Sequence, residues 1–251
     1  MEFRLTINNK WKYQIFHSSW VALDWLFPPT CGGCGSPGTR WCPACQEKVQ
    51  AIVDPICDAC GLPQQVGSGL CERCQQKPPA FKQLRSWAVF ENPVQGALHR
   101  LKYRRDIGMG EAISNQMSSF MHQLAWPVDT LIPIPLGKNR LKERGYNQVA
   151  MVAMPLSIQL GLEYHPSALV RARETRSQVG LSARERQENV NKAFLADKKK
   201  VSGRNILLMD DVSTTGATLS SAAEALYASG AKDVFAATIA RALPHHSLKI
   251  V

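Results

Sequence analysis

Residues 206–218 read Ile-Leu-Leu-Met-Asp-Asp-Val-Ser-Thr-Thr-Gly-Ala-Thr, and this stretch decides the fold. The four apolar residues from Ile206 to Met209 predict a short buried strand. Two carboxylates, Asp210 and Asp211, follow where that strand is expected to end, and a helix is expected from about residue 218 to residue 229. Because ligands of open α/β sheets collect at the carboxyl ends of strands, we expect a binding site here.

The loop after the acidic pair has the composition of a phosphate-binding loop. Backbone N–H groups that lead into a helix N-terminus attract anions, and a glycine lets the ligand approach the backbone closely. Ionised carboxylates only accept hydrogen bonds, which suits the two hydroxyls of a ribose whose 5-phosphate lies in the loop. The sequence therefore predicts Asp210 and Asp211 as catalytic residues and a phosphate loop of Ser213, Thr214, Thr215, Gly216, Ala217 and Thr218.

This order of residues resembles the phosphoribosyl-diphosphate (PRPP) signature of type I phosphoribosyltransferases. The resemblance rests on four apolar residues, an acidic pair and a Thr-Thr-Gly-x-Thr loop. A P-loop is excluded because no Gly-Lys-Ser/Thr follows the glycine. The alternative interpretation is a strand, an acidic turn and a well-capped helix, since acidic residues are common near helix starts. The motif alone does not separate a transferase from a regulator that binds PRPP.

A second segment, rich in basic residues, is expected at the same edge of the sheet. Residues 131–134 predict another strand, and four cations follow within seven positions, between residues 138 and 144. A pyrophosphate leaving group needs such charge compensation, or a magnesium ion. We therefore predict that Lys138, Arg140 and Arg144 bind PRPP together with Mg²⁺. The alternative is a solvated basic loop.

Residues 171–189 form a polar and basic stretch ahead of a helix that is expected to begin at Ser182. Such a stretch can close over a ligand as a flap and exclude water from the reaction. In that interpretation Ser177 and Gln178 face the ligand. An ordinary exposed loop is the alternative.

All eight cysteines fall in four Cys-x-x-Cys pairs, with intervals of seven, eleven and ten residues between the pairs. Four thiolates close one tetrahedral zinc site, so the set predicts two structural zinc ions. Sequential and interleaved pairing both remain open. A disulfide framework requires an exported chain, and a redox Cys-x-x-Cys usually occurs singly. The predicted ligands are Cys31, Cys34, Cys42, Cys45, Cys57, Cys60, Cys71 and Cys74.

The bulk properties set limits on the class of protein. The net charge of +10 and the pI near 9.3 favour anionic partners such as nucleic acid or phosphorylated small molecules. We find no apolar run long enough for a membrane span and no convincing secretory signal, so no membrane span is expected. Residues 14–28 predict a short helix that docks on the body, after a loosely attached start.

The rest of the chain alternates strands and helices, which predicts a mainly parallel sheet with helices on both faces. Within it, Pro155 is expected to kink or split the helix predicted from about residue 147 to residue 161. The predicted domains are an N-terminal extension (1–22), a double zinc ribbon (23–80), a phosphoribosyltransferase-like α/β domain (81–245) and a tail (246–251).

From about residue 22 to residue 243 the chain resembles the ComF family of competence and DNA-uptake proteins, which is related to GntX-type proteins. Four features in order carry the resemblance: the Cys-x-x-Cys ribbon, Leu101-Lys102-Tyr103, Arg140-x-x-x-Arg144-Gly-Tyr-Asn-Gln148, and Thr175-x-Ser177-Gln178-x-Gly180-Leu181 ahead of Asp210-Asp211. The resemblance implies a cytoplasmic protein with a phosphoribosyltransferase-like domain, linked to the transport or use of DNA.

Two functions follow from these features. In the first, the chain is a magnesium-dependent phosphoribosyltransferase that acts on an unidentified nitrogen acceptor. In the second, it is a non-catalytic adaptor that binds single-stranded DNA or a DNA-translocating helicase or other competence protein. A basic helix face, from His99 to Arg105, supports the adaptor if it contacts phosphates, but a solvated face explains it as well. DNA binding that is absent, or that stays flat as the salt concentration rises, counts against the adaptor.

Overall fold

The protein is described by a computed structural model that covers residues 8–65, 69–172 and 193–243. Its centre is a five-stranded sheet in the order β1-β7-β6-β2-β3, in which every neighbouring pair is parallel. The predicted parallel sheet is therefore confirmed. The strands are β1 (Leu84–Val89), β2 (Thr130–Pro133), β3 (Glu163–Tyr164), β6 (Asn205–Ser213) and β7 (Asp233–Arg241).

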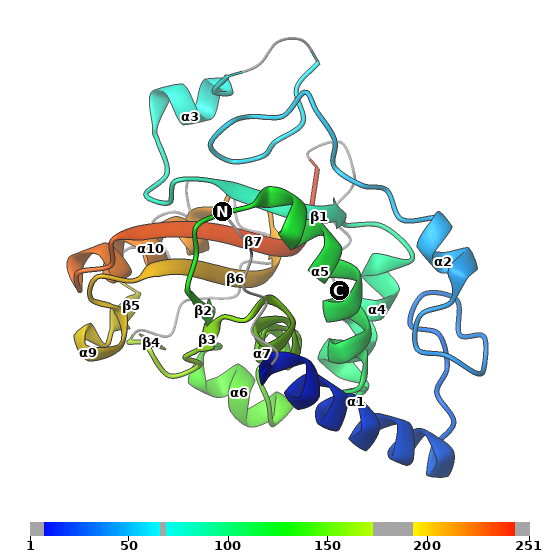
Figure 1. Cartoon of the computed structure of the whole chain (residues 1–251). Helices are drawn as coiled ribbons and strands as arrows, with labels where there is room; N and C mark the ends of the chain where they lie inside the picture. The colour runs from blue at the N-terminus through cyan, green and yellow to red at the C-terminus, as the bar shows by residue number, and fades with distance from the viewer. Residues whose placement is uncertain (1–7, 66–68, 173–192, 244–251) are drawn as a thin grey trace.

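Helices cover both faces of the sheet, as the alternating pattern predicts (Figure 1). One face packs against α4 (Val94–Tyr103), α5 (Met109–Leu124) and α7 (Gln148–Leu160). The other face packs against α10 (Ala217–Ala228), α9 (Lys198–Val201) and a two-stranded antiparallel hairpin of β4 (Leu169–Arg171) and β5 (Phe194–Ala196). Along β6, Leu207 and Met209 are buried on the α4/α5/α7 face, while Ile206 and Leu208 are buried on the α10 face.

Several local predictions are wrong in instructive ways. Strand β6 does not end at Met209 but continues through the acidic pair to Ser213, because β7 pairs with it as far as Arg241. Its other neighbour, β2, stops at Pro133, so the end of β6 projects beyond β2. Pro155 does not split α7, which runs without interruption from residue 148 to residue 160.

The basic segment after β2 is a helix and not a loop. Helix α6 (Lys138–Arg144) is held between two glycines that suit its ends. Gly137 is extended at the N-cap, and Gly145 has a φ of +83° at the C-cap, a conformation in which glycine has no Cβ penalty. The helix predicted from residue 182 lies outside the described residues.

The N-terminal helix begins earlier than expected. Helix α1 (Asn8–Leu26) starts well before residue 14 and docks on the body, to α5 in its first half and, near its end, through an ion pair of Asp24 with Arg40. Tyr13 donates a hydrogen bond to Glu111 on α5 at 3.1 Å, and His17 Nδ1 lies 2.8 Å from the same carboxylate. Among the described helices, none is long and apolar enough to cross a membrane.

The cysteine-rich segment runs along one side of the sheet, from α2 (Pro43–Glu47) near α4 to α3 (Glu72–Gln76) beyond β1 (Figure 1). Backbone hydrogen bonds join it to β1, from Leu84 N to Ala59 O at 2.7 Å and from Val89 N to Gln50 O at 2.8 Å. At the end of β7, the fully buried Arg241 donates to Cys60 O at 2.6 Å. The segment is thus attached to the sheet edge, which places it close to the expected binding site.

Candidate functional site

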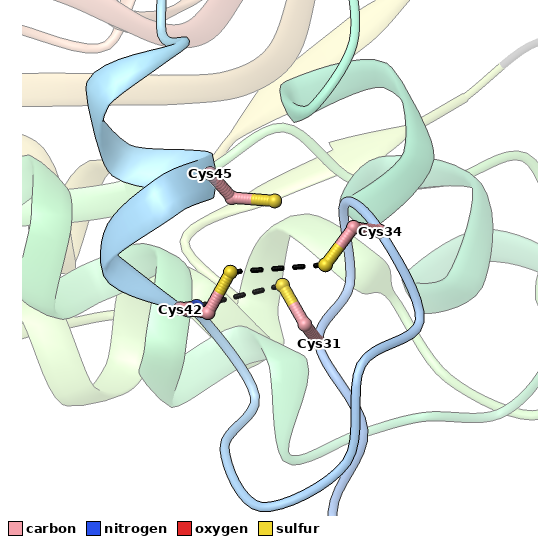
Figure 2. A group of neighbouring side chains, drawn as sticks. All are labelled: Cys31, Cys34, Cys42 and Cys45. Carbon is pink, nitrogen blue, oxygen red and sulfur yellow. Dashed lines mark hydrogen bonds between the residues drawn. The ribbon is translucent and has the colours of Figure 1, made fainter.

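The eight cysteines form two separate tetrads. Cys31, Cys34, Cys42 and Cys45 make the first tetrad, and Cys57, Cys60, Cys71 and Cys74 make the second; within each, all sulfur atoms lie within 4.8 Å of one another. The pairing is therefore sequential. Figure 2 shows the first tetrad, in which the four side chains converge from two knuckles.

The sulfur geometry fits zinc and not disulfides. The Cys34 and Cys42 sulfurs are 3.7 Å apart, and the Cys60 and Cys71 sulfurs are 3.8 Å apart. These separations match the edge of a tetrahedron with Zn–S bonds of about 2.3 Å. Backbone N–H groups also point at the sulfurs, for example from Cys71 N to Cys57 Sγ at 3.3 Å, which stabilises thiolate charge. Each tetrad can therefore hold one structural zinc ion.

The acidic pair lies at the projecting end of β6, with the two carboxylates in different surroundings. Successive side chains of a strand point to opposite faces. Asp211 reaches the α4/α7 side, where it meets Lys102 and Gln148. Asp210 is influenced by the charge of Arg171 on β4, which belongs to the opposite side of the sheet.

Asp211 is fully engaged by the protein. Its Oδ2 atom accepts from Lys102 Nζ at 2.9 Å and from Gln148 Nε2 at 2.7 Å, while its Oδ1 atom accepts from Val212 N at 2.7 Å. Burial acts to raise the pKa of this carboxyl, but the charge of Lys102 and the hydrogen bonds outweigh it, so the pKa is lowered below the usual range. Asp211 therefore stays ionised.

The network extends one step further along α6. Arg144 donates to Gln148 Oε1 at 2.6 Å, and its guanidinium lies 5.1 Å from the centre of the Tyr103 ring. Both the oxygen and the nitrogen of the Gln148 side-chain amide are thus hydrogen-bonded, and the amide links a cation of α6 to the carboxylate of Asp211. The amide orientation follows from these two partners.

Asp210 is the less satisfied member of the pair. Among the described residues, only the backbone N–H of Asp211 donates to its carboxylate, at 2.9 Å. Burial raises the pKa of Asp210 to about 7, and the neighbouring negative charge of Asp211 adds to the effect. A carboxyl with this pKa exchanges its proton near neutral pH, and it retains acceptor capacity for a ligand.

The predicted phosphate loop connects β6 to α10. Gly216 has a φ of +79° and caps the helix, where an added Cβ would lie 3.4 Å from the Phe81 ring. The hydroxyl of Ser213 is buried and has no hydrogen-bond partner among the described residues. An unsatisfied buried hydroxyl at the entrance of a helix is a group that a bound anion can satisfy.

The other predicted site residues lie in three separate places. Lys138 and Arg140 are exposed on α6, and Arg144 is partly buried within the Gln148 network. Ser177 and Gln178 lie outside the described residues, and so does most of the predicted flap. Thr214, Thr215 and Thr218 are half-buried in the loop or at the first turn of α10.

Two residues that contact the acidic pair, Lys102 and Gln148, are missing from the predicted site. Both lie in segments that carry the family resemblance, the Leu101-Lys102-Tyr103 stretch and the segment that ends at Gln148. Their roles are invisible in the sequence because each comes from a helix far from β6 along the chain. The sole signal was their position in those two segments.

Comparisons with known proteins agree with this architecture. Residues 22–75 match the double zinc ribbon domain family, and residues 149–248 match the phosphoribosyl transferase domain family. The chain is 33% identical over 217 residues to the DNA utilization protein YhgH of Shigella flexneri, which covers 82% of this chain and 94% of that protein. It is 32% identical over 204 residues to the competence protein ComFC of Bacillus subtilis, covering 77% and 80% respectively.

Among solved structures, the glutamine PRPP amidotransferase from B. subtilis in complex with ADP and GMP matches 57% of this chain and 30% of that chain, with 18% identity and a TM-score of 0.41. The sequence relatives are the stronger finding, since one of them is aligned almost from end to end. With its double zinc ribbon and phosphoribosyltransferase domain, the chain belongs to the ComF family of competence and DNA-utilisation proteins.

Proposed function

We propose that the protein binds PRPP with Mg²⁺ at the carboxyl end of β6 and transfers its phosphoribosyl group to a nitrogen acceptor. The observation that carries this proposal is the unpartnered buried hydroxyl of Ser213, placed between the acidic pair and the N-terminus of α10. The loop from Ser213 to Thr218 would hold the 5-phosphate. Asp210 would accept from the ribose hydroxyls, since Asp211 is already engaged by Lys102 and Gln148.

The transfer step exchanges one bond at the anomeric carbon for another. The C1–O bond to pyrophosphate breaks, the C1–N bond to the acceptor forms, and the acceptor nitrogen releases its proton. Positive charge develops on the sugar, and the carboxylates of the acidic pair would stabilise it. Lys138, Arg140 and Arg144 on α6, together with Mg²⁺, would neutralise the departing pyrophosphate.

Calorimetric titration of the zinc-replete protein with PRPP and MgCl₂ tests the binding step. Ser213→Ala is the most informative variant, because removal of a hydroxyl that has no partner leaves the fold intact. We expect it to weaken PRPP binding by roughly tenfold, the value of one hydrogen bond to a charged group. Ser202→Ala is the matched control and leaves binding unchanged, because this exposed serine lies just before the start of β6, at the opposite end of the strand from the loop.

The double variant Asp210→Asn, Asp211→Asn then tests the transfer. It is expected to abolish pyrophosphate release that depends on PRPP, measured with each candidate acceptor. Pyrophosphate release at the wild-type rate by a folded double variant would refute the mechanism, and full PRPP affinity in Ser213→Ala would refute the location of the phosphate.

We also propose that each cysteine tetrad holds one structural zinc ion. The short ribbon has few apolar side chains of its own. Among its described residues, Ala59 and Leu62 alone pack on the second tetrad, so metal binding would supply its folding energy. Elemental analysis should give two zinc ions per chain, and Cys34→Ser should give one. Two zinc ions in the Cys34→Ser protein would contradict the assignment.

A further inference from the structure

A second site lies outside the proposed PRPP site. A pocket of about 540 Å³ opens between the first zinc knuckle and α4. Its volume falls within the range of roughly 300–1,000 Å³ that is usual for small-molecule sites. One wall is the glycine-rich backbone of the knuckle, and the other is formed by α4 and the end of β1.

Close packing holds the two walls of the pocket together. An added Cβ on Gly96 of α4 would lie 3.0 Å from the carbonyl oxygen of Gly32, so glycine is required for this approach. Arg100 then fixes the knuckle, donating from Nη1 to Cys31 O at 3.0 Å and from Nη2 to Asp106 at 2.6 Å. The walls of the pocket are therefore built before any ligand arrives.

One donor in this wall remains unused. Arg100 Nε is buried and has no hydrogen-bond partner among the described residues, although both terminal nitrogens of the same guanidinium are bonded. A buried donor without a partner is rare, because desolvation without a hydrogen bond is unfavourable. Among the described residues, the guanidinium is thus held by its two terminal nitrogens alone.

The remaining lining points to an aromatic and anionic ligand. Phe90 and the exposed ring of His99 supply flat ring surfaces, and Tyr103 lies against His99 with ring centres 4.9 Å apart. Among the described lining residues, none is acidic. Lys102 and Arg100 each face an aspartate, so the charge that is left for a ligand comes chiefly from the exposed Arg104.

We propose that this pocket binds a nucleotide unit, with the base against the His99 and Phe90 side and the phosphate at Arg104. Bases stack on aromatic side chains without sequence preference, and the phosphate accounts for the cation at the rim. Lys102 lines the pocket and also binds Asp211, so the nucleotide would lie next to the acidic pair. The proposal stands without PRPP binding, since none of the phosphate-loop residues is part of the pocket.

The test uses two nucleotide sources, because a free nucleotide and a single strand share this chemistry. Deoxyadenosine monophosphate is titrated by calorimetry, and a fluorescein-labelled oligodeoxyadenosine by fluorescence anisotropy, with an abasic strand of equal length for comparison. The variants are His99→Ala and Arg104→Ala. The control is Lys199→Ala, which removes one exposed charge from α9 on the opposite face of the sheet.

We expect His99→Ala to weaken binding of the oligodeoxyadenosine roughly tenfold, in line with the loss of one stacking platform, and to leave the abasic strand unaffected. Arg104→Ala should weaken both strands and reduce the salt dependence, while Lys199→Ala changes neither. Tight monophosphate binding identifies the free nucleotide as the ligand, and binding of the strand alone identifies the polymer.

Three results would overturn the proposal: no binding of either probe, wild-type affinity in both pocket variants, or equal losses in Lys199→Ala and Arg104→Ala. Ser213→Ala separates this site from the PRPP site, since it should leave nucleotide affinity unchanged. Circular dichroism and a zinc content equal to the wild type verify that each variant is folded.

Discussion

Two adjacent carboxylates of β6 have opposite environments. Asp211, on the side of α4 and α7, is held ionised by a lysine, an amide and a backbone N–H. Asp210 receives a single backbone N–H among the described residues, and burial raises its pKa to about 7. The difference shows that a pair of identical residues in a motif can divide its roles, one fixed by the protein and one left open for a ligand.

The two environments follow from strand geometry. Because β6 extends to Ser213, its side chains alternate through the acidic pair and the carboxylates separate onto two faces. On one face, α4 and α7 supply Lys102 and Gln148. The pair can therefore be tested one member at a time, and the expected effects differ in sign.

The largest effect is expected for Asp211→Ala. This change leaves Lys102 mostly buried without its partner, and breaking a buried ion pair in this way costs roughly 3–5 kcal/mol of unfolding free energy. Chemical denaturation at pH 7.5 measures it. Asp233→Ala is the matched control, because the ion pair of Asp233 with Lys82 is half-exposed and screened by solvent, so its loss should have little effect on stability. Equal losses in the two variants would show that Asp211 is not specially engaged.

Lys102→Met should come next. It removes the cation but leaves Gln148 and Val212 N to satisfy Asp211, so we expect a loss of about 1–3 kcal/mol. Without Lys102 the pKa of Asp211 is expected to rise, because burial is then opposed only by hydrogen bonds. The loss should therefore be smaller at pH 5 than at pH 8. A loss that does not change between these pH values would contradict this account.

These effects depend on contacts that the sequence does not display. The motif at residues 206–218 predicted a buried strand, an acidic pair and a glycine-containing loop before a helix, and that order is present. The end of the strand was misplaced, because pairing with β7 carries β6 past its apolar run. Lys102 and Gln148 were missed because tertiary packing alone brings α4 and α7 to the end of β6.

The cysteines show the opposite case, in which spacing alone predicted the eight ligands and two metal sites. Their pairing was left open, and the sulfur positions show that it is sequential. Arg241 of β7 contacts the second tetrad, and Arg100 of α4 contacts the first. Local chemistry was thus readable in the sequence, whereas the partners that set its electrostatics were not.

An effect of opposite sign is expected for Asp210→Asn. Since the pKa of Asp210 is raised in the folded state, that state keeps a proton which the unfolded chain has already released. The carboxyl therefore lowers stability progressively as the pH rises from about 4 to 7. Asp210→Asn should be more stable than the wild type at pH 8, with little difference at pH 4.

Thermal denaturation of both proteins across this pH range measures the effect. The pKa of Asp211 is lowered, so the stabilising contribution of this carboxylate is lost as the pH falls below the usual aspartate pKa of about 3.9. The two carboxylates should thus act in separate pH ranges. A stability difference between Asp210→Asn and the wild type that is constant from pH 4 to pH 8 would place Asp210 in an ordinary, solvated environment.

The smallest effect is expected for Arg144→Ala, at the outer end of the network. Arg144 holds the amide of Gln148 and lies over the Tyr103 ring, contacts that together contribute about 0.5–1.5 kcal/mol. A double-mutant cycle with Asp211→Ala measures whether this contribution reaches the carboxylate. We expect a coupling free energy of about 0.5 kcal/mol or more, because both residues bond the same amide. Arg144 and Asp210 share no partner among the described residues, so the matching cycle with Asp210→Asn should give no coupling. Coupling of equal size in both cycles would mean that the two carboxylates respond as one unit, against the division inferred from β6.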